Sequence, residues 1–289
     1  MIFSKSSVIT STALLFLVFP LTSNAAYTTF ARAETSLDQI PGSGFVPNDL
    51  EEAANTGSSS FANATTIDQQ LDSGRPSGVL YRRQSLGEAS ASAGVLKAVA
   101  TAGFFADGYQ TGSFIDARST ASFSDILTVF RPGARQATVQ VTYAVSGSLF
   151  GSPNFANASG QLDVGNSPVI NFTNSTSLGA GAYTCSNGGA ASPCFGVVEL
   201  TLPTNTQISL RGSLSVFARA SGQLNRGNSS ALYGNTGYVY LSSADPEVQW
   251  FTQSGFSYLA PVPEAGTWAL LLAGLLTLGV FTRYRHGST

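Results

Sequence analysis

A period-two alternation of apolar and polar residues recurs across the second half of the chain and constrains its fold more than any other feature. The alternation is clearest in residues 138–145, 197–202, 208–216 and 238–241. Successive side chains of an extended strand point to opposite faces, so each segment presents one apolar and one polar face. Gly, Pro and Asn turn signals separate these segments, and no comparable amphipathic helix interrupts them. Residues 76–260 are therefore predicted to form an all-β, antiparallel β-sandwich, with jelly-roll-like connections as one form of it.

The preceding residues, 26–75, show a different pattern. They are polar and rich in Ala, Ser, Asn, Thr and Asp, and their hydrophobic periodicity is poor. Strands and helices that face a core require such periodicity. We therefore expect a polar lead-in segment, extended or partly helical, that precedes the sandwich.

Two segments of the predicted sandwich resemble each other. Residues 155–163 read FANASGQLD and residues 217–225 read FARASGQLN, with identity at seven of nine positions. We interpret them as equivalent strand-turn units of a pseudo-symmetric sandwich. The alternative is coincidence in a chain biased toward Gly, Ser and Ala.

Charged residues are scarce in this chain. They make up 10% of it, whereas about 25% is usual for soluble proteins. The 14 basic and 16 acidic residues include three basic residues and one acidic residue at the two ends, which leaves residues 26–260 with a net charge of −4. No basic stripe is present to neutralise phosphates, so nucleic acid is not an expected partner.

The N-terminus has the three parts of a removable signal peptide. Lys5 provides a positive charge, residues 8–21 form a mostly apolar run, and Ser23 and Ala25 are small residues at the −3 and −1 positions. We expect signal peptidase to cleave after Ala25, with Ala26 as the neighbouring site. The alternative is an uncleaved membrane anchor.

The C-terminus contains an uncharged run at residues 265–282. As a helix it spans about 27 Å, close to the thickness of a bilayer's hydrocarbon core. Arg283 and Arg285 follow, and basic residues remain on the cytoplasmic side. We therefore predict a transmembrane helix that ends inside the cell, with the sandwich outside. An ordinary single-pass tail anchor is one interpretation of this helix.

The motif Val262-Pro263-Glu264, the apolar helix TWALLLAGL within residues 267–275 and the Arg-containing end together resemble the PEP-CTERM sorting signal. The resemblance covers about the last 29 residues, with one departure: Ala265 stands where the family usually has proline. It implies an exosortase-type processing enzyme as a partner, the inner membrane as a transient or final location, and association with exopolysaccharide and the extracellular matrix.

The two cysteines, Cys185 and Cys194, lie close together in the segment TCSNGGAASPC. In the oxidising compartment that the signal peptide implies, they are predicted to form a disulfide that closes a short loop. A redox or metal role is disfavoured because there is no CxxC spacing, and two thiolates do not complete a zinc site.

Catalytic signatures are missing from the predicted domain. The only histidine, His286, lies beyond the membrane helix, so a Ser-His-Asp triad, a Cys-His dyad or a histidine metal cluster cannot form there. There is no phosphate-binding or dinucleotide-binding glycine loop. We therefore expect no enzymatic activity, no cofactor and no metal, and a Ca²⁺ loop at Asp245 and Glu247 is the alternative.

Carboxylates and aromatic residues leave two further options. A glycoside hydrolase needs only two facing carboxylates, and acids are scattered along the β region. Aromatic residues gather toward its end, where Tyr238, Tyr240 and Trp250 form a candidate ligand face. Such residues belong to a core more often than to a sugar-binding face.

Three functions follow, in order of preference. The first is a non-enzymatic cell-surface or extracellular-matrix protein, exported and sorted by its tail. The second is a carbohydrate-binding module that attaches to exopolysaccharide. The third is a polysaccharide hydrolase or lyase.

Overall fold

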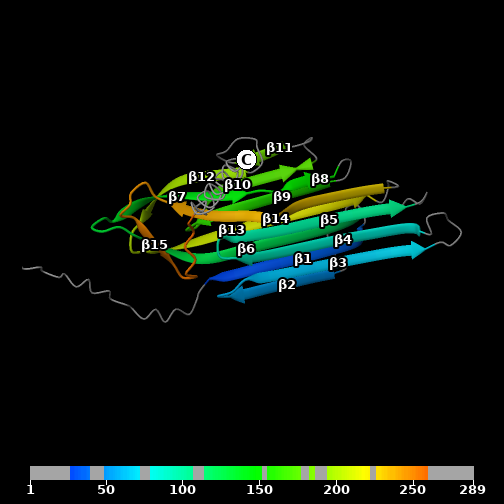
Figure 1. Cartoon of the computed structure of the whole chain (residues 1–289), viewed down its shortest axis with the longest axis horizontal. Coiled ribbons are helices and arrows are strands. Elements are labelled where there is room, and N and C mark those ends of the chain that lie inside the picture. The colour runs from blue at the N-terminus through cyan, green and yellow to red at the C-terminus, as the bar shows by residue number, and fades with distance from the viewer. Residues whose placement is uncertain are drawn as a thin grey trace, which may run out of the picture.

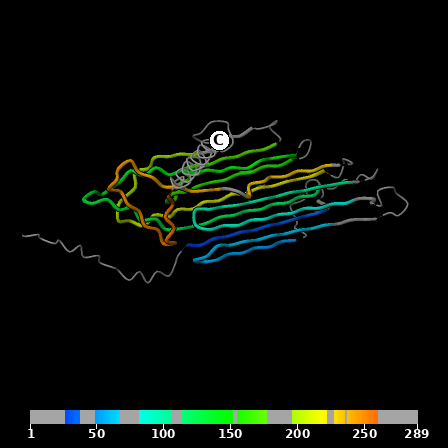
Figure 2. Tube along the Cα trace, in the orientation of Figure 1, coloured from blue at the N-terminus to red at the C-terminus, as the bar shows by residue number. Residues whose placement is uncertain are grey.

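The computed structural model describes residues 27–39, 49–71, 79–106, 114–151, 155–176, 182–185, 194–221 and 226–259. Within these residues the secondary structure consists almost entirely of strands, which form two antiparallel sheets stacked face to face (Figure 1). The strands of both sheets run along the long axis of the molecule (Figure 2). The predicted β-sandwich is confirmed at this level.

The larger sheet, called sheet A, contains eight strands. Their order is β11 (Ala182–Cys185), β10 (Ser167–Ser175), β9 (Phe155–Val164), β13 (Gln207–Ser221), β6 (Phe114–Phe130), β1 (Thr28–Gln39) and β2 (Asp49–Thr56), and β15 (Gln249–Thr252) pairs with β6 beyond the start of β1. Sheet A therefore joins the first and the last described strands through β6.

The smaller sheet, called sheet B, contains seven strands. Their order is β12 (Cys194–Pro203), β7 (Gln136–Val145), β14 (Arg226–Ser242), β5 (Val95–Ala106), β4 (Val79–Ser92) and β3 (Ser60–Leu71), and β8 (Ser148–Phe150) pairs with β14. β3, β4 and β5 form a meander of neighbouring strands.

The expectation of a separate lead-in over residues 26–75 was wrong for its described part. Residues 28–71 contribute β1, β2 and β3, and β1 pairs with β6 along most of its length. The inward side chains of β1 are small, among them Thr29, Ala31 and Ala33. Alternation of Ala and Thr with polar residues produces little hydrophobic contrast, so the strand pattern is not visible in the sequence.

The strands predicted from alternation are confirmed by burial. Residues 139, 141, 143 and 145 of β7 and residues 208, 210, 214 and 216 of β13 point into the core, and their neighbours face outward. Large side chains, among them Tyr143, Leu162 and Phe172, fill the core where β7, β9, β10 and β13 meet. Here the sandwich packs as such folds commonly do.

The core between β1, β6 and the β3–β5 meander is filled mainly by alanine. Its buried alanines are Ala31, Ala33, Ala62, Ala64, Ala89, Ala91, Ala98, Ala100, Ala102, Ala117 and Ala121. Small side chains let the sheets approach closely enough for polar contacts between them. Ser119 Oγ of sheet A donates a hydrogen bond to the carbonyl of Val99 in sheet B at 2.6 Å, and Thr35 Oγ1 lies 2.6 Å from Thr66 Oγ1.

The C-terminal described segment closes one end of the sandwich. After β15 the chain crosses to sheet B, where Leu241 N donates to the carbonyl of Tyr258 at 2.7 Å. The start of β1 lies at this same end (Figures 1 and 2), and Tyr27 is close enough to Tyr258 to affect its ionisation. Both predicted processing sites therefore adjoin this end in sequence. No helix among the described residues is long and apolar enough to span a membrane, and the predicted helix at 265–282 lies outside them.

Candidate glycan-binding groove on sheet A

The outer face of sheet A carries polar and aromatic side chains on several adjacent strands. On β6 and β13 the inward residues belong to the core, and the residues between them face outward. The strand register aligns these outward residues in rows across the sheet. One row contains Glu34, Arg118, Phe217 and Asn157.

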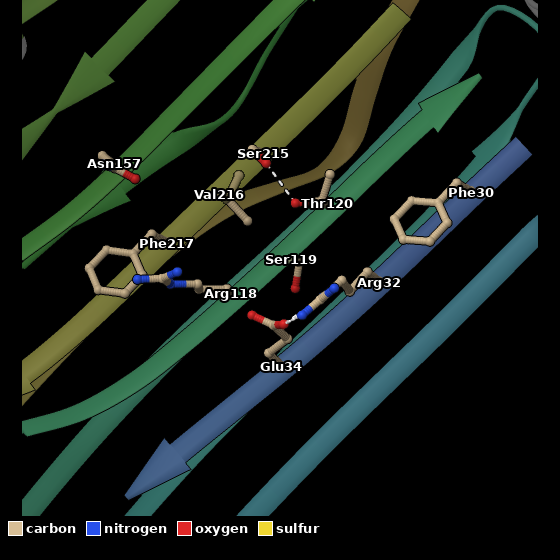
Figure 3. Close-up of a pocket in the computed structure, with 10 residues that line it drawn as sticks. All are labelled: Phe30, Arg32, Glu34, Arg118, Ser119, Thr120, Asn157, Ser215, Val216 and Phe217. Atoms are coloured by element: carbon tan, nitrogen blue, oxygen red, sulfur yellow. Dashed lines mark hydrogen bonds and ion pairs between the residues drawn. The ribbon is translucent and has the colours of Figure 1, made fainter. Parts of the chain in front are cut away.

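A hollow of about 400 Å³ lies over these rows (Figure 3). Its floor includes Thr120 and Ser215, whose hydroxyl oxygens are 2.6 Å apart. On the β1 side it is bordered by Phe30, Arg32 and Glu34. On the opposite side it is bordered by Phe217 with Arg118 and by Asn157.

An ion-pair network holds the β1 side of the hollow in place. The Arg32 guanidinium binds Glu34 and also Glu52, at 2.6 Å, so it bridges two strands. The Glu34 side chain is only 8% exposed, while Arg32 is 42% exposed. Because the pair is partly open to solvent, we assign it a positioning role rather than a large contribution to stability.

A second network supports the opposite side. The buried Asp116 carboxylate accepts hydrogen bonds from Arg219 Nε and Nη2, at 2.7 and 2.6 Å. The Arg219 guanidinium lies 4.7 Å from the Phe114 ring centroid, and Arg118 lies 5.1 Å from that of Phe217. The hydrogen bonds that Arg219 donates to Asp116 raise the pKa of Arg219, whereas burial lowers the pKa of Arg118. Both side chains remain charged, since arginine loses its proton only far above physiological pH.

A second hollow, of about 270 Å³, continues along the same face. It shares Phe30 with the first hollow, and it contains Ser122 and Ser213 as floor residues and Gln161 as a border residue. We call the two hollows together the sheet A groove. From Glu34 to Thr28 the groove follows seven residues of β1. The six steps between them span about 20 Å at about 3.4 Å per residue.

The groove combines aromatic, hydroxyl, amide and charged groups of the kinds that can bind a sugar chain. The aromatic rings of Phe30 and Phe217 can pack against apolar C–H faces. Hydroxyls, the Asn157 and Gln161 amides and the flanking charged groups can exchange hydrogen bonds with sugar hydroxyls, and bonds to charged groups are the stronger ones. Ligand sites commonly pair apolar walls with a few placed polar groups.

The residues predicted as a ligand face lie elsewhere. Tyr238 and Tyr240 are on the outer face of sheet B, half-buried, with ring centroids 5.9 Å apart and planes 17° apart. Trp250 belongs to β15 of sheet A, packs against the core and donates from Nε1 to the carbonyl of Ser257 at 2.9 Å. The structure therefore brings the two tyrosines together and places Trp250 on the other sheet.

Several predicted residues fall outside the described part. These are the cleavage residues Ala25 and Ala26, the sorting motif Val262, Pro263 and Glu264, and the flanking Arg283 and Arg285. Cys185 ends β11 and Cys194 begins β12, but their side chains are not described. The signal peptide, the sorting tail and the disulfide stay predictions.

The described parts of the two similar segments, residues 155–163 and 217–221, contribute to the flank of the groove. β9 and β13 pair antiparallel, and the Phe155 and Phe217 rings lie 5.8 Å apart on the outer face. In both strands the following alanines, Ala156 and Ala218, are buried. The repeated FAxA pattern, interpreted from the sequence only as a repeated strand-turn unit, lies in this part of the groove. The groove residues of β1 carry no such sequence signal, because they lie in the segment that was expected to be a polar lead-in.

Among the acidic residues scattered along the β region, Glu199 and Asp245 line one further hollow, on sheet B. Asp245 is paired with Arg131 at 2.8 Å and also accepts from the backbone N of Glu247, at 2.9 Å. In the described residues no group of three or more His, Cys, Asp or Glu side chains is placed to hold a metal ion.

Comparisons with known proteins add no assignment. No protein-family model matches the chain, and no curated protein matches it either.

Proposed function

We propose that this chain is an exported, non-enzymatic protein of the cell surface or extracellular matrix that holds a linear glycan in the sheet A groove. The two adjacent hollows of the groove, over β1, β6, β13 and β9, carry the binding part of the proposal. The tail residues 262–285 carry the sorting part, through their resemblance to the PEP-CTERM signal. In this proposal signal peptidase and an exosortase-type enzyme process the chain at the inner membrane, and the domain then associates with exopolysaccharide.

The geometry favours an elongated sugar ligand over other occupants. The backbone groups of β6 and β13 pair with strands on both sides, so an extended peptide finds no free edge in the groove. Aromatic rings at separate points along the groove, with hydroxyls between them, suit a ligand that repeats C–H faces and hydroxyls along its length.

The binding part is tested by affinity electrophoresis of the full chain in mild detergent, in gels that contain dextran, soluble β-glucan, alginate or hyaluronan. We expect retardation by at least one glycan, and a loss of about tenfold in affinity for Phe30→Ala or Asn157→Ala. Phe251→Ala is the matched control, because this phenylalanine is 61% exposed and lies outside the groove. If the protein migrates equally in gels with and without each glycan, the groove assignment is contradicted.

The sorting part is tested by intact-mass spectrometry of cell and culture-fluid fractions, with and without exosortase. We expect a mature form that begins near Ala26 and ends near Pro263, and that disappears without exosortase. An uncleaved tail in the inner membrane of both strains would identify a plain anchor and remove the matrix assignment.

Glycan cleavage, by hydrolysis or elimination, is the second candidate function, and the shared hollow of Glu199 and Asp245 favours it. Its test is the release of new reducing ends from the glycan that binds. Release that Glu199→Gln abolishes would replace the binding role with an enzymatic one.

A further inference from the structure

A second site lies on the opposite face of the sandwich, where Tyr238 and Tyr240 project from β14. Val239 and Leu241, which alternate with them, are buried in the core, so both tyrosines belong to the outer face of sheet B. Their rings are nearly parallel and both keep part of their surface exposed. The pair forms an aromatic surface at the end of the sheet where β14 pairs with β7.

A hollow of about 440 Å³ begins one row beyond Tyr240. Tyr240 pairs with Thr142 of β7, and in the next row Ser242 pairs with Gln140, which in turn pairs with Glu199 of β12. All three residues of that next row line the hollow. We call the tyrosine pair and this hollow together the sheet B platform.

Some polar groups of the platform are bonded to each other, and one is not. Arg131 Nη2 forms an ion pair with Asp245 Oδ2 at 2.8 Å, and Ser242 Oγ donates a hydrogen bond to Gln140 Oε1 at 3.1 Å. Glu199 is exposed, and its carboxylate makes no hydrogen bond or ion pair with any part of the chain that the structure describes. It is therefore an ionic acceptor open to hydroxyl donors from solvent or from a ligand.

A pyranose ring fits this arrangement. Its C–H face can pack on the tyrosine rings while adjacent hydroxyls donate to Glu199 and bond to the Gln140 amide. A nucleic acid does not fit, because two carboxylates oppose one arginine in the hollow. An extended peptide does not fit either, since β7 is paired with β12 and β14 along this stretch, and the other side of β14 donates hydrogen bonds to the carbonyls of Gly94 and Tyr258.

We propose that the platform is a second glycan-binding site and that the protein cross-links glycan chains. This inference rests on the proposed function of the sheet A groove. The groove and the platform lie on the outer faces of different sheets, and the hydrophobic core separates them. One molecule can therefore hold two chains at once, and repeated sugar units on each chain convert modest single-site affinities into a network.

The experiment measures site number and cross-linking separately, with the full chain in mild detergent and the glycan from the four-member panel that retards it. Calorimetry with a short oligosaccharide of that glycan is expected to give two sites per chain. Light scattering with the long glycan is expected to show a network. The double variant Tyr238→Ala/Tyr240→Ala is expected to lose the network and one site, and to keep groove affinity within about twofold.

Two further variants distinguish loss of the aromatic binding surface from misfolding of the protein. Tyr238→Phe/Tyr240→Phe retains both rings and is expected to keep the network, while Phe150→Ala, an exposed residue of sheet B outside the hollow, is expected to behave as wild type. If calorimetry gives a single site per chain, and Phe30→Ala removes that site, the platform assignment is overturned and the groove assignment is kept. Two sites in the double alanine variant would overturn it as well. No retardation by any glycan would overturn the proposed function itself.

Discussion

At the scale of single residues, Gly87 lies where β4 of sheet B packs closely against β6 of sheet A. It lies on the inward face of β4, and a Cβ atom there would sit 2.8 Å from the backbone oxygen of Arg118 and 3.0 Å from Ser119 Oγ. A backbone atom cannot move aside as the end of a flexible side chain can. The alanine-rich part of the core therefore depends on a position without any side chain.

Gly87→Ala is expected to lower the free energy of unfolding by about 1–3 kcal/mol, the usual cost of overpacking. Without the clash, alanine would stabilise a strand by restricting the unfolded chain. Urea unfolding measures the change, and Ser90→Ala on the outer face of the same strand is the control, expected to stay within about 0.5 kcal/mol. An unchanged or increased stability for Gly87→Ala would mean that the sheets separate there at no cost.

Asp125 fixes the C-terminal segment from a buried position. Its carboxylate accepts hydrogen bonds from Ser254 N at 3.1 Å, from Tyr258 OH at 2.9 Å and from Ser254 Oγ. Asp125→Asn is expected to cost about 2–3 kcal/mol, because the amide nitrogen cannot accept at one of these positions. Tyr258→Phe removes one donor and should cost less. Urea unfolding ranks the two variants, and the reverse order would show that the phenol rather than the carboxylate organises the segment.

At the scale of elements, the edge strand β3 shows how the sandwich protects its open side. Its outer face exposes Phe61 and Ile67, each 57% exposed, and an unprotected apolar edge invites association. Two backbone groups of this edge are occupied by β2 carboxylates. Asn63 N donates to Glu51 and Thr65 N donates to Asp49, at 2.9 and 2.8 Å.

The double variant Asp49→Ala/Glu51→Ala is expected to self-associate in a concentration-dependent way, because it frees two edge N–H groups and removes two charges. Size-exclusion chromatography with light scattering measures this. Glu52→Ala, in the same strand but paired with Arg32, is the control and should elute as wild type. Equal elution of both variants would show that the carboxylates do not protect the edge.

At the scale of the whole molecule, buried phenols connect the sheets to each other. Tyr143 OH of sheet B donates to the carbonyl of Ser213 in sheet A at 2.9 Å, and Tyr258 contacts Asp125 of sheet A while its carbonyl binds β14 of sheet B. Burial raises the pKa of both tyrosines above the usual value near 10. Both phenols thus stay protonated in the folded state at a pH where the unfolded chain loses those protons.

A raised folded-state pKa contributes stability that is present below the unfolded value and is lost as the pH rises past it. Stability is therefore expected to fall above about pH 10, with a limiting slope of about 2.7 kcal/mol per pH unit for two phenols. Urea unfolding between pH 8 and 11 measures the slope, which Tyr143→Phe/Tyr258→Phe should flatten. The same slope in that variant would assign the alkaline loss to other groups.

Sequence alone identified much of the local structure and little of the site. Strong alternation predicted β7, β12, β13 and part of β14, because branched and aromatic residues on one face of a strand contrast with polar residues on the other. β1 to β3 lacked this contrast, because their inward residues are small. The sequence identifies Tyr238 and Tyr240 as a pair, since residues two apart on a strand share a face. It does not show that Trp250 belongs to the other sheet.

What the sequence determined by itself is the strand character of the second half of the chain, together with the predicted processing signals at both ends, because these depend on neighbouring residues. Tertiary structure decided the order of strands in each sheet, the placement of β1 against β6, and the groove. The contact of Arg219 with Asp116 spans 103 positions in the chain, and Thr120 meets Ser215 across 95. No local pattern encodes such pairings, since they exist only once two packed sheets have fixed which strands are neighbours and in which register.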